Sequence, residues 1–134
     1  MYNDIYNKEQ YAYERNTLLK WLAFSIDGKK PEHFFYKNGF QKIVIYGVRC
    51  FGELFYNQIR KSGIEVVCFA DRDYANYPDG IDGITVSSLK GLNTIDFDVI
   101  VVTPTFYFND ILTDLIKNKI NLNKILSLNM VLAD

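Results

Sequence analysis

One stretch of the chain decides the fold, Ile43-Val44-Ile45-Tyr46-Gly47-Val48-Arg49-Cys50-Phe51-Gly52. Its first four residues are a continuous β-branched and aromatic run, which is typical of a strand buried on both faces. The run ends at Gly47, and residues 50–61 then have helical spacing, with an inward face that we predict to hold Phe51, Leu54, Phe55 and Ile59. A buried strand that turns through glycine into a helix is the opening of a βαβ unit.

The same alternation continues to the end of the chain. Strand-like runs cover residues 64–70, 84–86, 98–103 and 124–128, and a helical pattern covers 106–118. Strands that alternate with helices predict a parallel sheet, and right-handed crossovers leave few topologies. We therefore predict an α/β fold with a Rossmann-like, three-layer open sheet of about five parallel strands in the order 3-2-1-4-5.

The first part of the chain has helical patterns and no strand. Residues 9–27 predict a helix with Trp21 beside an apolar stripe made of Tyr11, Leu18, Leu22 and Ile26. Gly28 ends this helix, and Pro31 can begin a short second one. We expect residues 1–40 to be a helical extension that docks either on the core or on another subunit, and residues 41–134 to be the Rossmann-like, nucleotide-binding-type domain.

Composition excludes several classes of function. The net charge is −1 and no basic stripe is present, so nucleic acid is not an expected partner. No apolar run approaches the roughly 20 residues of a membrane helix, and the N-terminus lacks the features of a signal peptide. With two cysteines and one histidine, neither a disulfide framework nor a structural metal site is expected. We expect a cytoplasmic protein, with Cys50 as a buried structural thiol.

Aromatic residues are unusually frequent, at 16% of the chain. Most of these rings are expected to pack in the core. Such a content also favours partly exposed rings, which suit an oligomer contact or the stacking of a base. A homodimer through the N-terminal helix is therefore one expectation.

The glycine turn is close to a dinucleotide-binding fingerprint. That motif is G-x-G-x-x-G between a strand and a helix, with an acidic residue about 20 positions later. Gly47 and Gly52 match its outer glycines, which permit the tight turn and the close packing of the helix. Asp71, at the end of the second strand, is the acidic residue. The middle glycine, which lets the backbone approach a pyrophosphate, is replaced by Arg49.

Two interpretations of Arg49 remain open. Its side chain can crowd a dinucleotide in the usual pose, so that the site is lost. Alternatively, an arginine at a helix N-terminus can bring its own charge to an anion or phosphate. Binding of NAD or NADP in the usual manner is less favoured than either of these.

Further candidates lie at the carboxyl ends of the strands. Asp71 suits a ribose hydroxyl, or it is a solvated carboxylate paired with Arg72. Thr103 can hydrogen-bond a ligand, or it caps the next helix. The candidate nucleotide- or cofactor-binding residues are Gly47, Val48, Arg49, Gly52, Asp71, Arg72 and Thr103. No catalytic residue and no metal ligand is predicted.

Three segments together resemble a known family. They are Lys42-Ile43-Val44-Ile45-Tyr46-Gly47, Ser62-Gly63-Ile64-Glu65-Val66-Val67-Cys68-Phe69-Ala70-Asp71-Arg72, and Asp98-Val99-Ile100-Val101-Val102-Thr103-Pro104. These segments resemble the Rossmann-like NAD(P)-binding-type domains of bacterial surface-polysaccharide proteins. Such domains occur alone or fused to glycosyltransferases, methyltransferases and acetyltransferases. The resemblance implies a nucleotide or nucleotide-sugar ligand, or a scaffolding role beside capsule enzymes. It implies no catalytic residue.

Three functions follow as hypotheses. The first is a non-catalytic module that binds a nucleotide or nucleotide-sugar in surface-polysaccharide biosynthesis. The second is a ligand-free interaction or oligomerisation module that docks on a polysaccharide-biosynthesis enzyme or on itself. The third is a fragment of a sugar-nucleotide oxidoreductase, which is disfavoured because neither Tyr36 nor Tyr107 has a lysine four residues later.

Overall fold

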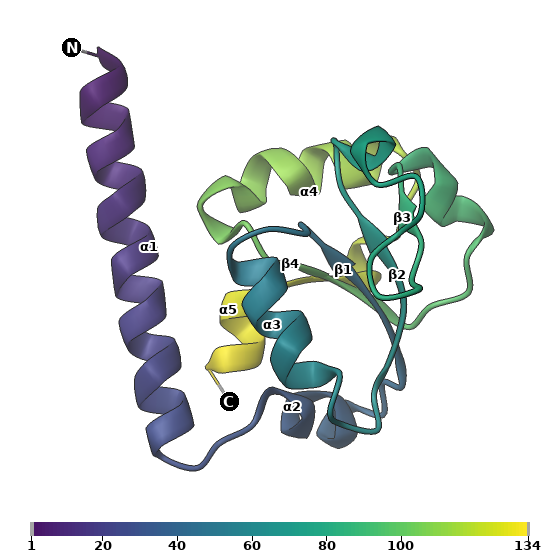
Figure 1. Cartoon of the computed structure of the whole chain (residues 1–134), viewed down its shortest axis with the longest axis horizontal. Helices are drawn as coiled ribbons and strands as arrows, with labels where there is room; N and C mark the ends of the chain where they lie inside the picture. The colour runs from purple at the N-terminus through teal and green to yellow at the C-terminus, as the bar shows by residue number, and fades with distance from the viewer. Residues whose placement is uncertain (1, 134) are drawn as a thin grey trace.

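The computed structural model describes residues 2–133, and it forms a parallel sheet between two layers of helices (Figure 1). Its elements in chain order are α1 (Tyr2–Ile26), α2 (Pro31–Asn38), β1 (Lys42–Tyr46), α3 (Phe51–Ile59), β2 (Glu65–Ala70), the 3₁₀ turn η1 (Tyr74–Asn76), β3 (Val86–Ser87), η2 (Lys90–Thr94), β4 (Val99–Val102), η3 (Thr105–Tyr107), α4 (Phe108–Lys117), η4 (Leu122–Lys124), β5 (Ile125–Ser127) and α5 (Leu128–Leu132). No helix in this range is long and apolar enough to span a membrane.

The sheet has the predicted topology. Its five strands run in the order β3-β2-β1-β4-β5, and every neighbouring pair is parallel. In the centre, β1 pairs with β2 on one side and with β4 on the other, so that Ile45 lies beside both Phe69 and Val101. The predicted α/β class, strand order and N-terminal helix are therefore confirmed.

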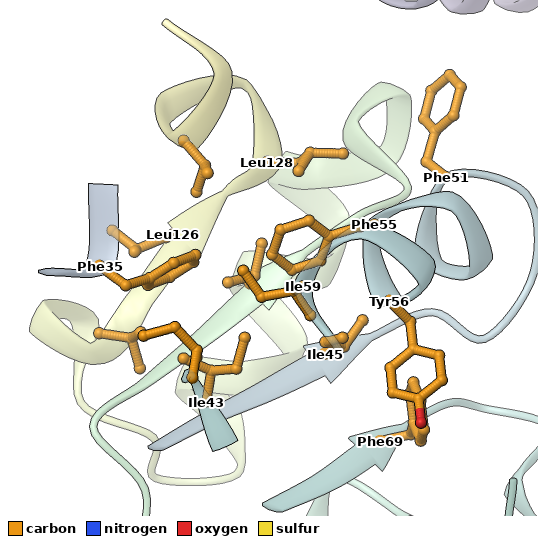
Figure 2. Packing of buried hydrophobic residues seen from close by; sticks show 14 of the residues in the cluster. Phe35, Ile43, Ile45, Phe51, Phe55, Tyr56, Ile59, Phe69, Leu126 and Leu128 are labelled. Atoms are coloured by element: carbon orange, nitrogen blue, oxygen red, sulfur yellow. The ribbon is translucent and has the colours of Figure 1, made fainter. Parts of the chain in front are cut away.

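The two faces of the sheet are packed by different helices. Because side chains alternate along a strand, Ile43 and Ile45 of β1 point to one face, and Val44 and Tyr46 point to the other. The first face is covered by α3 together with α2, α5 and part of α1, and Figure 2 shows Phe55 and Ile59 of α3 lying over β1. The second face is covered by α4 and η2. Each fully buried large side chain in these cores contributes about 1.5–3 kcal/mol.

The helix α1 docks through a different face from the apolar stripe seen in the sequence. Among residues 7–26 of this helix, the buried ones are Thr17, Trp21 and Phe24. The Trp21 indole nitrogen donates a 2.8 Å hydrogen bond to Gln58 of α3, and its ring meets the Phe51 ring edge-on. The stripe of Tyr11, Leu18, Leu22 and Ile26 remains exposed. Apolar residues surround α1 on more than one side, so periodicity alone does not select the docking face.

Two predictions about α3 and its start are wrong. Leu54 is exposed, and Tyr56 takes the inward position beside Phe69, with the two ring centres 5.1 Å apart. Cys50 is exposed and not a buried thiol. It lies in the loop between the carboxyl end of β1 and the first turn of α3. The other cysteine, Cys68, is buried in β2, and burial raises the pKa of its thiol to about 11.

A carboxylate joins the beginnings of β1 and β4. Asp98 precedes β4, and one of its oxygens accepts hydrogen bonds from the backbone N–H groups of Gln41 and Lys42, at 2.8 and 2.9 Å. These two bonds hold the pKa of the Asp98 carboxyl below its usual range. The neighbouring Asp96 makes only an exposed ion pair with Lys42.

Asp98→Asn is expected to lower the melting temperature near pH 7, because a neutral amide accepts hydrogen bonds more weakly than a carboxylate. A lowered folded-state pKa means that this stabilisation is present at neutral pH and is lost as the pH falls through the acidic range. The difference from the wild type should therefore shrink as the pH falls below the ordinary pKa of an aspartate, about 3.9. Asp96→Asn is the matched control and should change little. A difference that is independent of pH would contradict the assignment.

Candidate functional site

The candidate site is a cleft at the carboxyl edge of the sheet. Two neighbouring cavities of about 360 and 200 Å³ open there, and both are bounded by Gly47, Asp71, Asp73, Pro104 and Tyr107. These residues follow β1, β2 and β4. In open α/β sheets, ligands bind at this edge, where the chain leaves neighbouring strands in opposite directions. Here the two directions are α3 on one face and α4 on the other.

The turn between β1 and α3 depends on two glycines. Gly47 has φ of +98°, which disfavours any side chain, and a Cβ there would lie 2.6 Å from the Thr103 hydroxyl. A Cβ on Gly52 would overlap the carbonyl oxygen of Gly47. Both glycines therefore have the structural roles expected from the sequence. Neither requires a ligand.

Asp71 is tied to this turn by its carboxylate. One oxygen accepts a 3.1 Å hydrogen bond from the backbone N–H of Val48, and the other accepts a 2.9 Å bond from the N–H of Asp73. Asp71 is partly exposed and lines both cavities. Each carboxylate oxygen can accept a further bond, so a ligand hydroxyl can still be bound.

Arg49 lies at the mouth of the smaller cavity and points toward the loop after β2. Its Nε donates a 3.3 Å hydrogen bond to the Tyr77 hydroxyl. This bond, together with nearby acidic groups, raises the pKa of the guanidinium further, so the side chain is always charged. Arg49 is exposed, and so its charge is available at the N-terminal end of α3.

Arg72 does not pair with Asp71. Its side chain lines the larger cavity, and its guanidinium forms a 3.3 Å ion pair with Asp114 of α4. The same guanidinium lies near the hydroxyl of Tyr46, the last residue of β1. Burial raises the pKa of Tyr46, although Arg72 opposes the shift. The phenol is therefore protonated at neutral pH and can act as a hydrogen-bond donor.

Thr103 is fully buried and lines neither cavity. Its hydroxyl donates a 2.6 Å hydrogen bond to the carbonyl oxygen of Tyr46, which joins the end of β4 to the end of β1. The cleft thus brings together Gly47, Val48, Arg49 and Asp71, with Arg72 on its far side. Gly52 and Thr103 support it from beneath.

Part of the cleft comes from the N-terminal helix, which sequence reasoning did not place there. Gln10 and Glu14 of α1 line the smaller cavity. The Tyr107 hydroxyl donates a 2.9 Å hydrogen bond to Gln10, and the Tyr13 ring meets Phe106 edge-on at 5.5 Å. Because these contacts join residues about a hundred positions apart, no local pattern predicts them.

The cleft is lined mainly by charged and aromatic side chains, with the exposed Cys50 in the smaller cavity. Its charged residues include four carboxylates, Glu14, Asp71, Asp73 and Asp110, against the two guanidiniums of Arg49 and Arg72. Among the described residues that line either cavity, none is a histidine, serine or lysine. Within residues 2–133, no three metal-ligating side chains gather as a metal ion would require. The arrangement therefore offers hydroxyl acceptors, aromatic faces and two separate positive charges.

Cys50 has a backbone conformation that non-glycine residues rarely adopt, with φ of +52° and ψ of −114°. Cys50→Gly should relieve this strain and raise the free energy of unfolding by about 1 kcal/mol, after the entropic cost of the added glycine. Cys50→Ala removes the thiol but keeps the strain, so it should not stabilise. Urea denaturation of the three proteins gives the comparison. Equal stability of the glycine and alanine variants would contradict the strain.

In the comparison with known proteins, the similarity to a protein family lies in the sheet domain. No curated protein matches it. A family model described as "C2185-like, N-terminal" matches residues 39–126, from just before β1 into β5. The matched region includes the glycine turn, Asp71 and Pro104, whereas the α1 residues of the cleft lie outside it. The chain belongs to the C2185-like, N-terminal family.

Proposed function

We propose that this protein is a non-catalytic module that binds a nucleotide or a nucleotide-sugar in the cleft at the carboxyl edge of its sheet. The observation that carries the proposal is the meeting of the Gly47 turn, the Asp71 carboxylate and the Arg49 guanidinium around one cavity. The Asp71 carboxylate accepts hydrogen bonds, and the Arg49 guanidinium attracts anions. A ligand with both hydroxyl and phosphate groups needs both kinds of partner.

The charges suggest how such a ligand lies. A phosphate is repelled by carboxylates, so its favoured position is beside Arg49 at the N-terminal end of α3. The sugar or ribose hydroxyls then face Asp71, which keeps acceptor capacity beyond its two backbone bonds. The rings of Phe106 and Tyr107 provide an apolar wall for a base or a sugar face.

The wider context that we propose is bacterial surface-polysaccharide biosynthesis. It rests on the resemblance of the strand and turn segments to the Rossmann-like domains of such proteins. A second candidate function is protein interaction, which the exposed apolar stripe of α1 favours. An oxidoreductase role is the least supported, because neither Tyr36 nor Tyr107 is followed by a lysine four residues later.

Arg49→Ala tests the phosphate position. Losing a charge-assisted hydrogen bond costs about 1.5–3 kcal/mol, which corresponds to roughly 10- to 150-fold weaker binding. We expect UDP-glucose to raise the melting temperature of the wild type progressively as its concentration increases above the dissociation constant, and to raise that of the variant much less at equal concentration. Calorimetric titration with UDP-glucose, UDP and NAD gives the affinities.

Arg60→Ala is the matched control, because it removes an exposed arginine that lines neither cavity. It should bind UDP-glucose as the wild type does. Tighter NAD binding by Arg49→Ala would show that the arginine only blocks the site. Absence of any shift with millimolar UDP-glucose, UDP and NAD would contradict a nucleotide-binding function.

A further inference from the structure

A stripe of large apolar side chains on one flank of the molecule has no cover. It is formed by α1 and by one residue of α3, and its members are between 44 and 74% exposed. Single exposed leucines are common on protein surfaces, whereas several large apolar side chains gathered on one side of a helix favour an interaction surface. From here on, the stripe includes two further exposed residues, Leu19 of α1 and Leu54 of α3, beside the four already named. Its full membership is Tyr11, Leu18, Leu19, Leu22, Ile26 and Leu54.

The geometry of α1 gathers these residues on one side. Tyr11, Leu18 and Leu22 are separated by seven and four positions, so they follow one line along the helix. This line runs beside Trp21, whose side chain docks on α3. Figure 1 shows α1 standing along the flank of the sheet domain, with its N-terminal end extending beyond the rest of the molecule.

The stripe borders a groove between α1 and α3. The groove has a volume of about 330 Å³, and its lining includes Leu18, Leu22 and Leu54. Its remaining lining is Trp21 and the small or neutral polar residues Ser25, Asn57 and Gln58. A helix that is apolar on a second face is typically buried on both sides. An apolar helix therefore fits this groove better than a charged or extended segment.

The exposed area matches the requirement of a stable dimer. If a fully exposed large side chain presents roughly 200 Å², the exposed fractions of the six residues correspond to about 700 Å² in each copy. A stable two-protein interface buries about 800 Å² from each partner. The stripe alone supplies most of this area, before any polar rim is added.

We propose that the stripe pairs with the same stripe of a second copy of this chain, so that two α1 helices pack against each other around a two-fold axis. This interface deepens the interaction role named above and does not depend on nucleotide binding. Gln10 and Glu14 turn toward the cleft, whereas the stripe lies on another side of α1. The cleft can therefore bind a ligand while the stripe is buried in the dimer.

Arg15 sets the direction of the pairing. It is exposed and lies on the same side of α1 as the stripe, between Tyr11 and Leu18. In a parallel pair, each residue would meet its own counterpart, and two guanidiniums would be brought together. An antiparallel pair centred on Leu18 and Leu19 places Arg15 near the partner's Leu22 and Tyr11 near the partner's Ile26. The geometry thus favours the antiparallel dimer.

Sedimentation equilibrium of the full chain without ligand tests the dimer. The wild type should show twice the 15.6 kDa chain mass at micromolar concentrations. Leu18→Glu combined with Leu22→Glu should return the mass to that of one chain, and it should keep the circular dichroism of the folded protein because both side chains are exposed. Asn16→Glu combined with Ala23→Glu is the matched control. It adds the same charge on an exposed side of α1 outside the stripe and should remain dimeric.

Disulfide crosslinking in a Cys50→Ser background tests the direction. Tyr11→Cys mixed with Ile26→Cys should crosslink between the two variants under oxidation, whereas Tyr11→Cys alone should crosslink poorly. Cys68 is buried and should not interfere. A monomeric wild type, or a dimer that survives the Leu18 and Leu22 substitutions, would overturn the interface. Efficient self-crosslinking of Tyr11→Cys would overturn the antiparallel arrangement. Nucleotide titration of the monomeric variant keeps the two proposals separate.

Discussion

The approach of α3 to the turn after β1 is the contact on which the rest of the structure depends. It is possible only because Gly52 has no Cβ, since one there would overlap the carbonyl oxygen of Gly47. Gly47 in turn adopts a φ of +98°, which sends the chain sharply out of the sheet and into the helix. With α3 seated this closely, Phe55 and Ile59 reach the centre of one sheet face.

The same contact creates the edge where the cleft opens. The chain leaves β1 toward one face and leaves β4 toward the other, so the carboxyl ends of these strands are not closed over by a shared helix. Thr103 and Tyr46 join the two strand ends from beneath. The Asp71 carboxylate then binds the Val48 amide and completes the wall from β2. The three strand ends are thereby fixed to one another by hydrogen bonds at the edge where the two cavities open.

The helix α1 links the cleft to the outer surface of the molecule. Its inner side docks through Trp21 and presents Gln10 and Glu14 to the smaller cavity. Its outer side presents Leu18 and Leu22 to solvent. A helix with apolar residues on two sides has buried only one of these sides against its own chain here. The proposed dimer buries the other apolar side, and this burial is favourable for the same reason as burial in the core.

The sequence by itself determined the order of strands and helices, the parallel sheet and the roles of Gly47 and Gly52, because these depend on local periodicity and on the space around one backbone atom. It also indicated that Asp71 lies at the carboxyl edge. Only the tertiary structure decided that the buried Thr103 hydroxyl bonds the end of β1, and that Tyr107 meets α1. These outcomes depend on contacts between segments far apart in the chain, and on which side of a helix with apolar residues on more than one side finds the better-fitting surface. No local pattern carries that information.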